Sequence, residues 1–132
     1  MIYIVDTNII SYLLKNRDTK LVDKFENISK EHTVGVSSIT IAELYYGVKK
    51  KKSQKLEVRV REFLSPLARF SFDENASFVY GEIRTRLESN GNTIGAHDML
   101  IAAHAKSLAA VLVTNNTREF LRVDGLKIED WV

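Results

Sequence analysis

The sequence has no cysteine among its 132 residues, which excludes disulfide bonds, thiolate nucleophiles, and zinc or iron–sulfur centres held by cysteine. No apolar run approaches the length that crosses a membrane, and the first residues, MIYIV, are too short for a signal peptide and lack its basic flank. A cytoplasmic protein is therefore expected. The formal net charge of +2 is too small for the overall basic field of a protein that coats DNA.

The sequence contains few features that would mark a boundary between domains. There is one proline, and no repeat, low-complexity stretch or linker is found, so we expect a single domain over residues 1–132. Short apolar runs predict strands at Ile2–Val5, Thr33–Val36, Ala68–Phe72, Val111–Val113 and Leu126–Ile128. Apolar residues spaced by three and four predict helices around residues 9–14, 21–28, 41–48, 56–67, 76–87 and 99–105.

The alternation of strands and helices is typical of an α/β fold with a central, mainly parallel sheet covered on both faces. Residues 99–105 are apolar nearly all round, so we expect that helix to be central and buried. In such sheets, ligands bind beyond the carboxyl ends of the strands. Functional residues are therefore to be sought where the predicted strands end.

One carboxylate occurs in each of four short stretches, IYIVDTN, SSITIAEL, IGAHDMLIAA and LVTNNTREF. Asp6 and Glu119 follow predicted strands, and Glu43 and Asp98 lie near the starts of predicted helices. Further polar side chains follow predicted strand ends; they are Ser37, Ser38, Thr114, Asn115 and Asn116. Carboxylates gathered at one place repel each other unless a cation joins them, and hard oxygen ligands suit Mg²⁺ or Mn²⁺. The sequence therefore predicts a divalent-metal site that acts on phosphate.

Each carboxylate taken alone also has a structural explanation. Asp6 could cap a helix that begins near Asn8, and Asp98 could stabilise a helix N-terminus through the dipole. Residues 40–43 fit a capping box, and residues 116–119 fit a weaker variant of it. The shared site is favoured by the joint placement of the four acids, each beside a strand end or at the base of a helix.

The strongest basic feature is the run KKKKSQK, which contains Lys49, Lys50, Lys51 and Lys52 and separates two predicted helices. One interpretation is a solvated junction between helices, and the other is an edge beside the site that follows phosphate groups. Arg84, on the helix predicted around residues 76–87, could add to that edge. Both interpretations remain open at the level of sequence.

The histidines carry less information. His97 and His104 are seven residues apart, a rise of about 10 Å on a helix, so they cannot share one metal ion. His97 is next to Asp98 and could touch a substrate, whereas His104 is expected in the core or on a dimer face.

Four segments taken in order, IYIVDTNIISYLL, SSITIAELYYGV, IGAHDMLIAAHAKSL and VLVTNNTREFLRVDGLKIEDW, resemble the PIN-domain proteins. More closely, they resemble the VapC toxins of bacterial type II toxin–antitoxin modules, over essentially the whole chain. The resemblance implies a three-layer α/β/α sandwich and an endoribonuclease that depends on Mg²⁺ or Mn²⁺. It also implies an RNA substrate, with transfer RNA expected, a VapB-type antitoxin that blocks the site, a homodimer, and contact with DNA only through the antitoxin.

Most of the family's functional positions fall on residues already singled out. The acidic, metal-holding positions correspond to Asp6, Glu43, Asp98 and Glu119, and the supporting polar positions to Thr7, Asn8, Thr114 and Asn116. Asp6 and Asp98 are then expected to be direct ligands, with Glu43 a ligand or the group that orients the attacking water. Many relatives carry Asp where this chain has Glu119, so its longer side chain is expected to act through water.

Two other functions are compatible with parts of the pattern. A phosphoacceptor receiver domain shares the fold class, and Asp73 follows the third predicted strand, where a phosphoacceptor could sit. Against it, the first strand ends in Asp-Thr-Asn rather than in an acidic pair. A non-catalytic nucleic-acid binding module would use the lysine run but would give no reason for four gathered acids.

Overall fold

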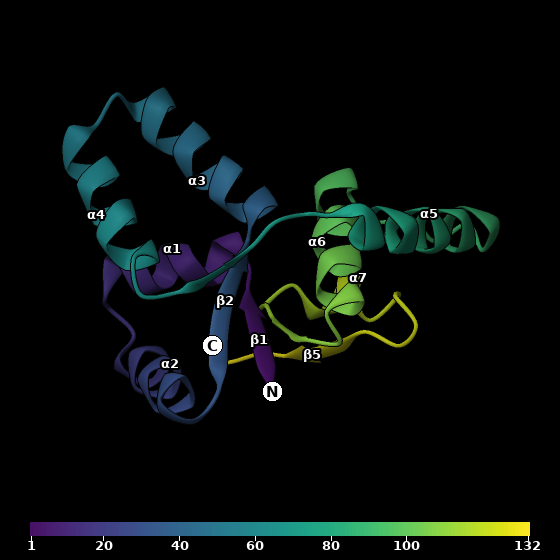
Figure 1. The fold of residues 1–132 in the computed structure, drawn as a ribbon, viewed down its shortest axis with the longest axis horizontal. Coiled ribbons are helices and arrows are strands. Elements are labelled where there is room, and N and C mark those ends of the chain that lie inside the picture. Colours follow the sequence, from purple (N-terminus) through teal and green to yellow (C-terminus); the bar gives the residue numbers. More distant parts are fainter.

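The computed structural model describes residues 1–132 as a five-stranded sheet with helices on both faces (Figure 1). The strands are β1 (Ile2–Val5), β2 (Thr33–Ser37), β3 (Ala68–Phe70), β4 (Val111–Val113) and β5 (Lys127–Glu129). The helices are α1 (Thr7–Lys15), α2 (Thr19–Glu31), α3 (Ser38–Lys51), α4 (Gln54–Leu64), α5 (Glu74–Ser89), α6 (Ala96–Ser107) and α7 (Thr117–Phe120). Every pair of neighbouring strands is parallel, so the predicted α/β fold is confirmed.

The central strand β1 sends alternate side chains into two separate cores, as a strand buried on both faces must. Tyr3 and Val5 join a core with buried residues of α1, α2, α3 and α4. Ile4 joins the other core, with buried residues of α5, α6 and α7. Figure 1 shows these two groups of helices on opposite sides of the sheet, with α3 and α4 forming a hairpin and α5 lying beside α6.

Helix α6 is central, as its composition predicts. All residues from Ile101 to Ala105 are buried. His104 is among them, and its Nδ1 lies 2.7 Å from the Oγ of Ser37, at the start of α3. Burial lowers the pKa of His104, which favours the neutral imidazole in this contact. The expectation that His104 belongs to the core is confirmed.

Some predicted boundaries shift for local reasons. Strand β3 ends at Phe70 rather than Phe72, because the backbone N–H of Phe72 donates to Ser38 Oγ at 3.0 Å instead of continuing the ladder. Helix α4 ends at Leu64, two residues before Pro66, because a proline disfavours helical geometry in the residue before it. No helix combines the length and apolar character needed to cross a bilayer.

The strand order β3-β2-β1-β4-β5 reverses direction at β1. The chain fills one side of β1 with β2 and β3, and later fills the other side with β4 and β5. In open parallel sheets, the crevice at such a reversal, beyond the carboxyl ends of the strands, is where ligands bind. The fold therefore directs attention to the loops that follow β1 and β4.

Candidate active site

Asp6 occupies the position directly after β1. Its backbone N–H donates to Val113 O at 3.1 Å, which ties it to the end of β4. It caps α1, because its Oδ1 accepts from the backbone N–H of Ile9 at 3.0 Å, as the sequence allowed. Although its side chain is ionisable, Asp6 is only 8% exposed. The cap accounts for one oxygen of Asp6 and leaves a buried carboxylate at the reversal point of the sheet.

Glu43 lies inside α3 and reaches across to two other elements. Helix α3 begins at Ser38 and is capped by Ser37, whose Oγ accepts from the N–H of Ile39, so the capping box predicted for residues 40–43 is wrong. Instead, Glu43 Oε2 accepts from Thr7 Oγ1 at 3.1 Å and lies 3.0 Å from His97 Nε2. The structure therefore brings α1, α3 and the first turn of α6 together at this carboxylate.

Asp98 and Glu119 share one partner, the side-chain amide of Asn116. Asn116 Nδ2 lies 3.4 Å from Asp98 Oδ2 and 3.2 Å from Glu119 Oε2. Asn116 makes no side-chain cap on α7, so the weaker capping box predicted for residues 116–119 is wrong. Its backbone N–H donates to Thr114 Oγ1 at 3.0 Å, which fixes the turn after β4. Asp98 does lie in the first turn of α6, where the helix dipole favours negative charge.

The pKa shifts of these acids show that their carboxylates interact electrostatically. Burial, and then the neighbouring Glu119, Asp6 and Glu43 carboxylates, raise the pKa of Asp98 to about 7. Burial also raises the pKa of Asp6, and hydrogen bonds from the Thr114 hydroxyl and the backbone N–H groups of Ile9 and Asn8 oppose that rise. The cluster therefore carries negative charge that no nearby group of the protein fully balances.

A small cavity of about 80 Å³ lies at the centre of this arrangement. We call it the acid cavity; it is lined by Asp6, Thr7, Asn8, Glu43, His97, Asp98, Ile101 and Phe120. Five of the predicted site residues line it, while Thr114, Asn116 and Glu119 hold or flank its acids. The apolar walls, Ile101 and Phe120, were not predicted, although Ile101 lies three residues after Asp98 on α6 and so shares its face.

The donor set fits a hard divalent cation, because carboxylate oxygens are the ligands that Mg²⁺ and Mn²⁺ prefer. A cation there would also relieve the repulsion that raises the pKa of Asp98. As placed, no three His, Asp or Glu side chains of the chain lie close enough together to coordinate one metal ion. Binding therefore requires side-chain adjustment, in which Glu43 and Glu119, the longer acids, have the reach to take part.

Comparison with known proteins agrees with this geometry. The family model of the PIN domain matches residues 3–126. Ribonuclease VapC2 of Rickettsia felis is 43% identical over 132 residues, covering 99% of this chain and 98% of the relative. This chain belongs to the VapC family of PIN-domain ribonucleases.

Two further VapC matches extend over nearly the whole chain. The tRNA(fMet)-specific endonuclease VapC of Shigella flexneri is 38% identical over 130 residues, covering 98% of this chain and 97% of its own length. The crystal structure of VapBC2 from Rickettsia felis bound to a DNA fragment from their promoter matches with a TM-score of 0.92 at 41% identity, covering 100% of both chains. The resemblance read from the motifs is thereby confirmed.

Membership of the VapC family overturns the receiver-domain alternative. Asp73, the phosphoacceptor candidate, is an exposed N-cap of α5 whose Oδ1 accepts from the N–H of Ala76 at 2.9 Å. It lies outside the acid cavity, and β3, which precedes it, is an edge strand of the sheet.

The lysine run does not lie beside the acid cavity, where a surface that follows RNA phosphates from the site would be expected. Lys49–Lys51 form the last turn of α3, and Lys52 is its C-cap. They lie at the tip of the α3–α4 hairpin, whose base is at the sheet (Figure 1). Lys49 Nζ is 3.4 Å from Glu57 Oε1. Arg84 lies on α5, where it pairs with Glu88 at 3.3 Å.

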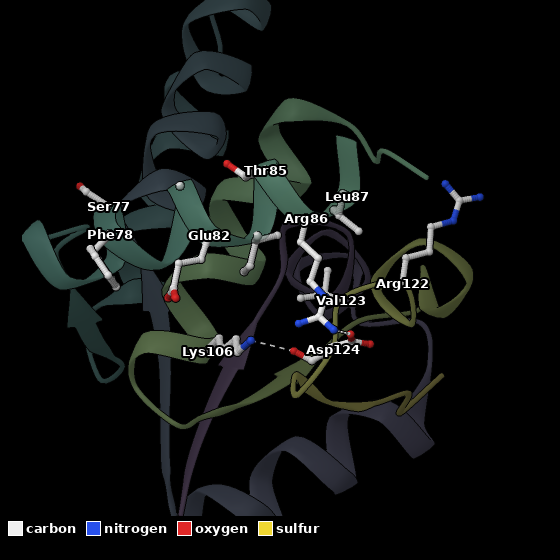
Figure 2. Close-up of a pocket in the computed structure, with 12 residues that line it drawn as sticks. Ser77, Phe78, Glu82, Thr85, Arg86, Leu87, Lys106, Arg122, Val123 and Asp124 are labelled. Atoms are coloured by element: carbon white, nitrogen blue, oxygen red, sulfur yellow. Dashed lines mark hydrogen bonds and ion pairs between the residues drawn. The ribbon is translucent and has the colours of Figure 1, made fainter. Parts of the chain in front are cut away.

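A larger cavity of about 750 Å³ lies elsewhere in this VapC-family chain, between α5, the end of α6 and residues 122–124. We call it the α5 groove. Figure 2 shows Arg86 and Lys106 both directed toward Asp124. Arg86 lies 3.0 Å from Asp124 Oδ2, and Lys106 Nζ donates to Asp124 O at 2.8 Å. No predicted site residue lines the groove, and these two cations already have partners within the chain.

Proposed function

We propose that this chain is the toxin of a VapBC-type pair and hydrolyses RNA phosphodiester bonds in the acid cavity with a divalent metal ion. The observation that carries the proposal is the convergence of Asp6, Glu43 and Asp98, from three different elements, on one small cavity at the reversal point of the sheet. Glu119 adds a fourth carboxylate through its shared contact with Asn116. The family membership supplies the reaction class.

In the proposed mechanism, Asp6 and Asp98 would hold the metal ion directly, and Glu119, which has the longer side chain, would act through water. When bound, Mg²⁺ or Mn²⁺ neutralises phosphate charge and makes a water molecule easier to deprotonate near neutral pH. Glu43, which is partly exposed at the cavity, would hold the metal ion or orient the attacking water. Thr114 and Asn116 hold the carboxylates of Asp6, Asp98 and Glu119 by hydrogen bonds. Thr7 supports Glu43.

The attacking group is water, so the 2′-hydroxyl of the substrate is not the nucleophile. Hydrolysis then leaves the 3′ oxygen as the leaving group, and its developing charge is stabilised inside the cavity. Preference for RNA over DNA must come from the shape of the RNA and from contacts to 2′-hydroxyls. Transfer RNA is the proposed substrate class, because the Shigella flexneri relative is a tRNA(fMet)-specific endonuclease.

The proposed partner is a VapB-type antitoxin. It is supported by the Rickettsia felis structure, in which VapBC2 is bound to a DNA fragment from their promoter. Contact of the present chain with DNA is then expected only through its antitoxin. A homodimer remains a prediction from the family resemblance.

The test is to incubate purified protein with total RNA and Mg²⁺ and to map the new ends by sequencing. The proposal expects a small set of cuts, concentrated in transfer RNA, that disappear with EDTA. Asp6→Ala serves as the matched inactive protein, since it removes a proposed ligand. Cuts that persist in EDTA, or that Asp6→Ala produces equally, would contradict a metal-dependent site at the acid cavity.

A further inference from the structure

We propose that His97 is a positioning residue for Glu43 and sets the direction of that carboxylate within the acid cavity. This inference rests on the proposed function, because it assigns a role within the same site. It starts from the contact between His97 Nε2 and Glu43 Oε2, at 3.0 Å. A carboxylate oxygen can only accept, so the imidazole attracts it when Nε2 carries the proton.

Glu43 needs such a contact because its neighbours repel it. Glu43, Asp6 and Asp98 all line the acid cavity, so their carboxylates repel one another across it. The side chain of Glu43 is 42% exposed, so it has room to turn toward water and away from the other acids. Without a restraint, repulsion and side-chain freedom both favour that outward direction.

Two polar side chains supply the restraint, and both approach the same oxygen. Thr7 Oγ1, at the start of α1, lies 3.1 Å from Oε2, and His97 Nε2, in the first turn of α6, approaches it from a different element. The other oxygen, Oε1, accepts no hydrogen bond from the protein. Glu43 is thus held by one oxygen and presents the second one free, which is the arrangement required of a group that must bind a cation or a water molecule.

The position of His97 suits it to orient Glu43, and no other structural role is evident for its side chain. It lines the acid cavity, its side chain is 34% exposed, and Glu43 is the only acidic side chain with which it pairs. It does not cap α6, whose N-cap is Gly95. The imidazole therefore joins α6, which carries Asp98, to α3, which carries Glu43, and it acts on the reaction through Glu43.

The experiment compares His97→Phe, which keeps a planar ring without a donor, with His97→Gln, which keeps a donor. His32→Phe is the matched control, because His32 packs edge-on against Tyr3 with a centroid distance of 5.5 Å and precedes β2, at the opposite end of the strands. Single-turnover cleavage of transfer RNA, Mn²⁺ affinity by calorimetry and RNA binding by the metal-free protein are measured for each variant.

We expect His97→Phe to lower the cleavage rate and weaken Mn²⁺ binding by about tenfold each, as loss of a partner of a metal ligand does. RNA binding and the melting temperature should stay unchanged, His97→Gln should recover most of the loss, and His32→Phe should match wild type. In a Glu43→Gln background, His97→Phe should have no further effect, because both changes act on one carboxylate.

The inference is overturned if His97→Phe matches wild type in both cleavage and Mn²⁺ affinity, or if His97→Gln is as impaired as His97→Phe. Additive effects of His97→Phe and Glu43→Gln would also overturn it, since His97 would then act independently of Glu43. A wild-type protein that neither cleaves RNA nor binds Mn²⁺ would instead remove the proposed function, and this inference with it.

Discussion

The α5 groove is larger than the acid cavity, but its cations Arg86 and Lys106 have partners, whereas the smaller acid cavity gathers carboxylates that repel one another. The groove, at about 750 Å³, is far larger than the acid cavity, at about 80 Å³. In the groove, Arg86 and Lys106 are both satisfied by Asp124. In the acid cavity, burial and the neighbouring carboxylates raise the pKa of Asp98 to about 7, and His97 is the basic side chain that pairs with one of these acids, Glu43. Unbalanced charge, rather than volume, is the better sign of a reactive site here.

The strongest test of which region is the active site is to remove one charged side chain from each and compare RNA cleavage. Asp98→Asn should lower RNA cleavage by more than about a hundredfold, because even indirect partners of metal ligands commonly contribute 10–100-fold. Arg86→Ala, in the α5 groove, should leave cleavage close to wild type. Initial rates on a transfer RNA substrate with Mg²⁺ measure both. A large loss in Arg86→Ala, or near-normal cleavage by Asp98→Asn, would reverse the assignment of the two regions.

Metal should stabilise the folded protein through the acid cavity. A ligand that binds only the native state adds about 2.7 kcal/mol to the free energy of unfolding at a hundredfold excess over its dissociation constant. Mn²⁺ should therefore raise the melting temperature of wild type and of Arg86→Ala equally, and that of Asp98→Asn much less. Thermal melts with Mn²⁺ and with EDTA measure this. Equal shifts in wild type and Asp98→Asn would mean that the ion binds elsewhere.

Without metal, Asp98 should destabilise the fold as the pH rises. The pKa of Asp98 is raised from 3.8 to about 7, so the folded protein keeps a proton that the unfolded chain has lost. Ionisation therefore opposes folding, with no penalty below about pH 4 and the full penalty above about pH 7. In EDTA at about pH 8, Asp98→Asn should be more stable than wild type by about 1–2 kcal/mol, allowing for solvent screening.

Urea titrations at about pH 4 and about pH 8 provide the measurement, and the two proteins should converge at the lower pH. If Asp98→Asn is instead much less stable than wild type at both values, Asp98 serves the N-terminus of α6 rather than a crowded acidic site.

The smallest effect on chemistry is expected at the tip of the α3–α4 hairpin. Changing Lys50, Lys51 and Lys52 together to Gln should weaken RNA binding and reduce the salt slope by up to about 2, since each phosphate contact contributes about 0.7. Single-turnover cleavage at saturating RNA should change little, because the tip is remote from the acid cavity. An unchanged salt slope would identify the run as a solvated helix end.

The sequence predicted the parts of the site that follow from strand ends. Asp6 and Thr114 follow β1 and β4 directly, and parallel strands bring such residues to one edge of a sheet. Asn116 was also a predicted site residue. What it does there could not be read from spacing, because its amide joins Asp98 and Glu119, which belong to two different elements.

Contacts between distant segments were the part that could not be predicted. The Thr7–Glu43 hydrogen bond joins residues 36 positions apart, and local pattern favoured a capping box for Glu43 instead. The pairing of His97 with Glu43 and the early end of β3 at the Ser38 hydroxyl depend in the same way on tertiary packing. Sequence patterns describe single elements well, but they carry little information about which side chains meet between elements.

The position of β4 in the sheet has a consequence for how the protein is made. Strand β4 pairs with β1, the first strand of the chain, yet it begins only at Val111. Asp98 and Glu119 flank it in sequence, so a ribosome still translating the middle of the message holds a chain with Asp6 and Glu43 but without a complete acid cavity. Strand order thus delays the complete acid cavity until the chain has been made at least as far as Glu119, so a shorter nascent chain lacks part of the proposed active site.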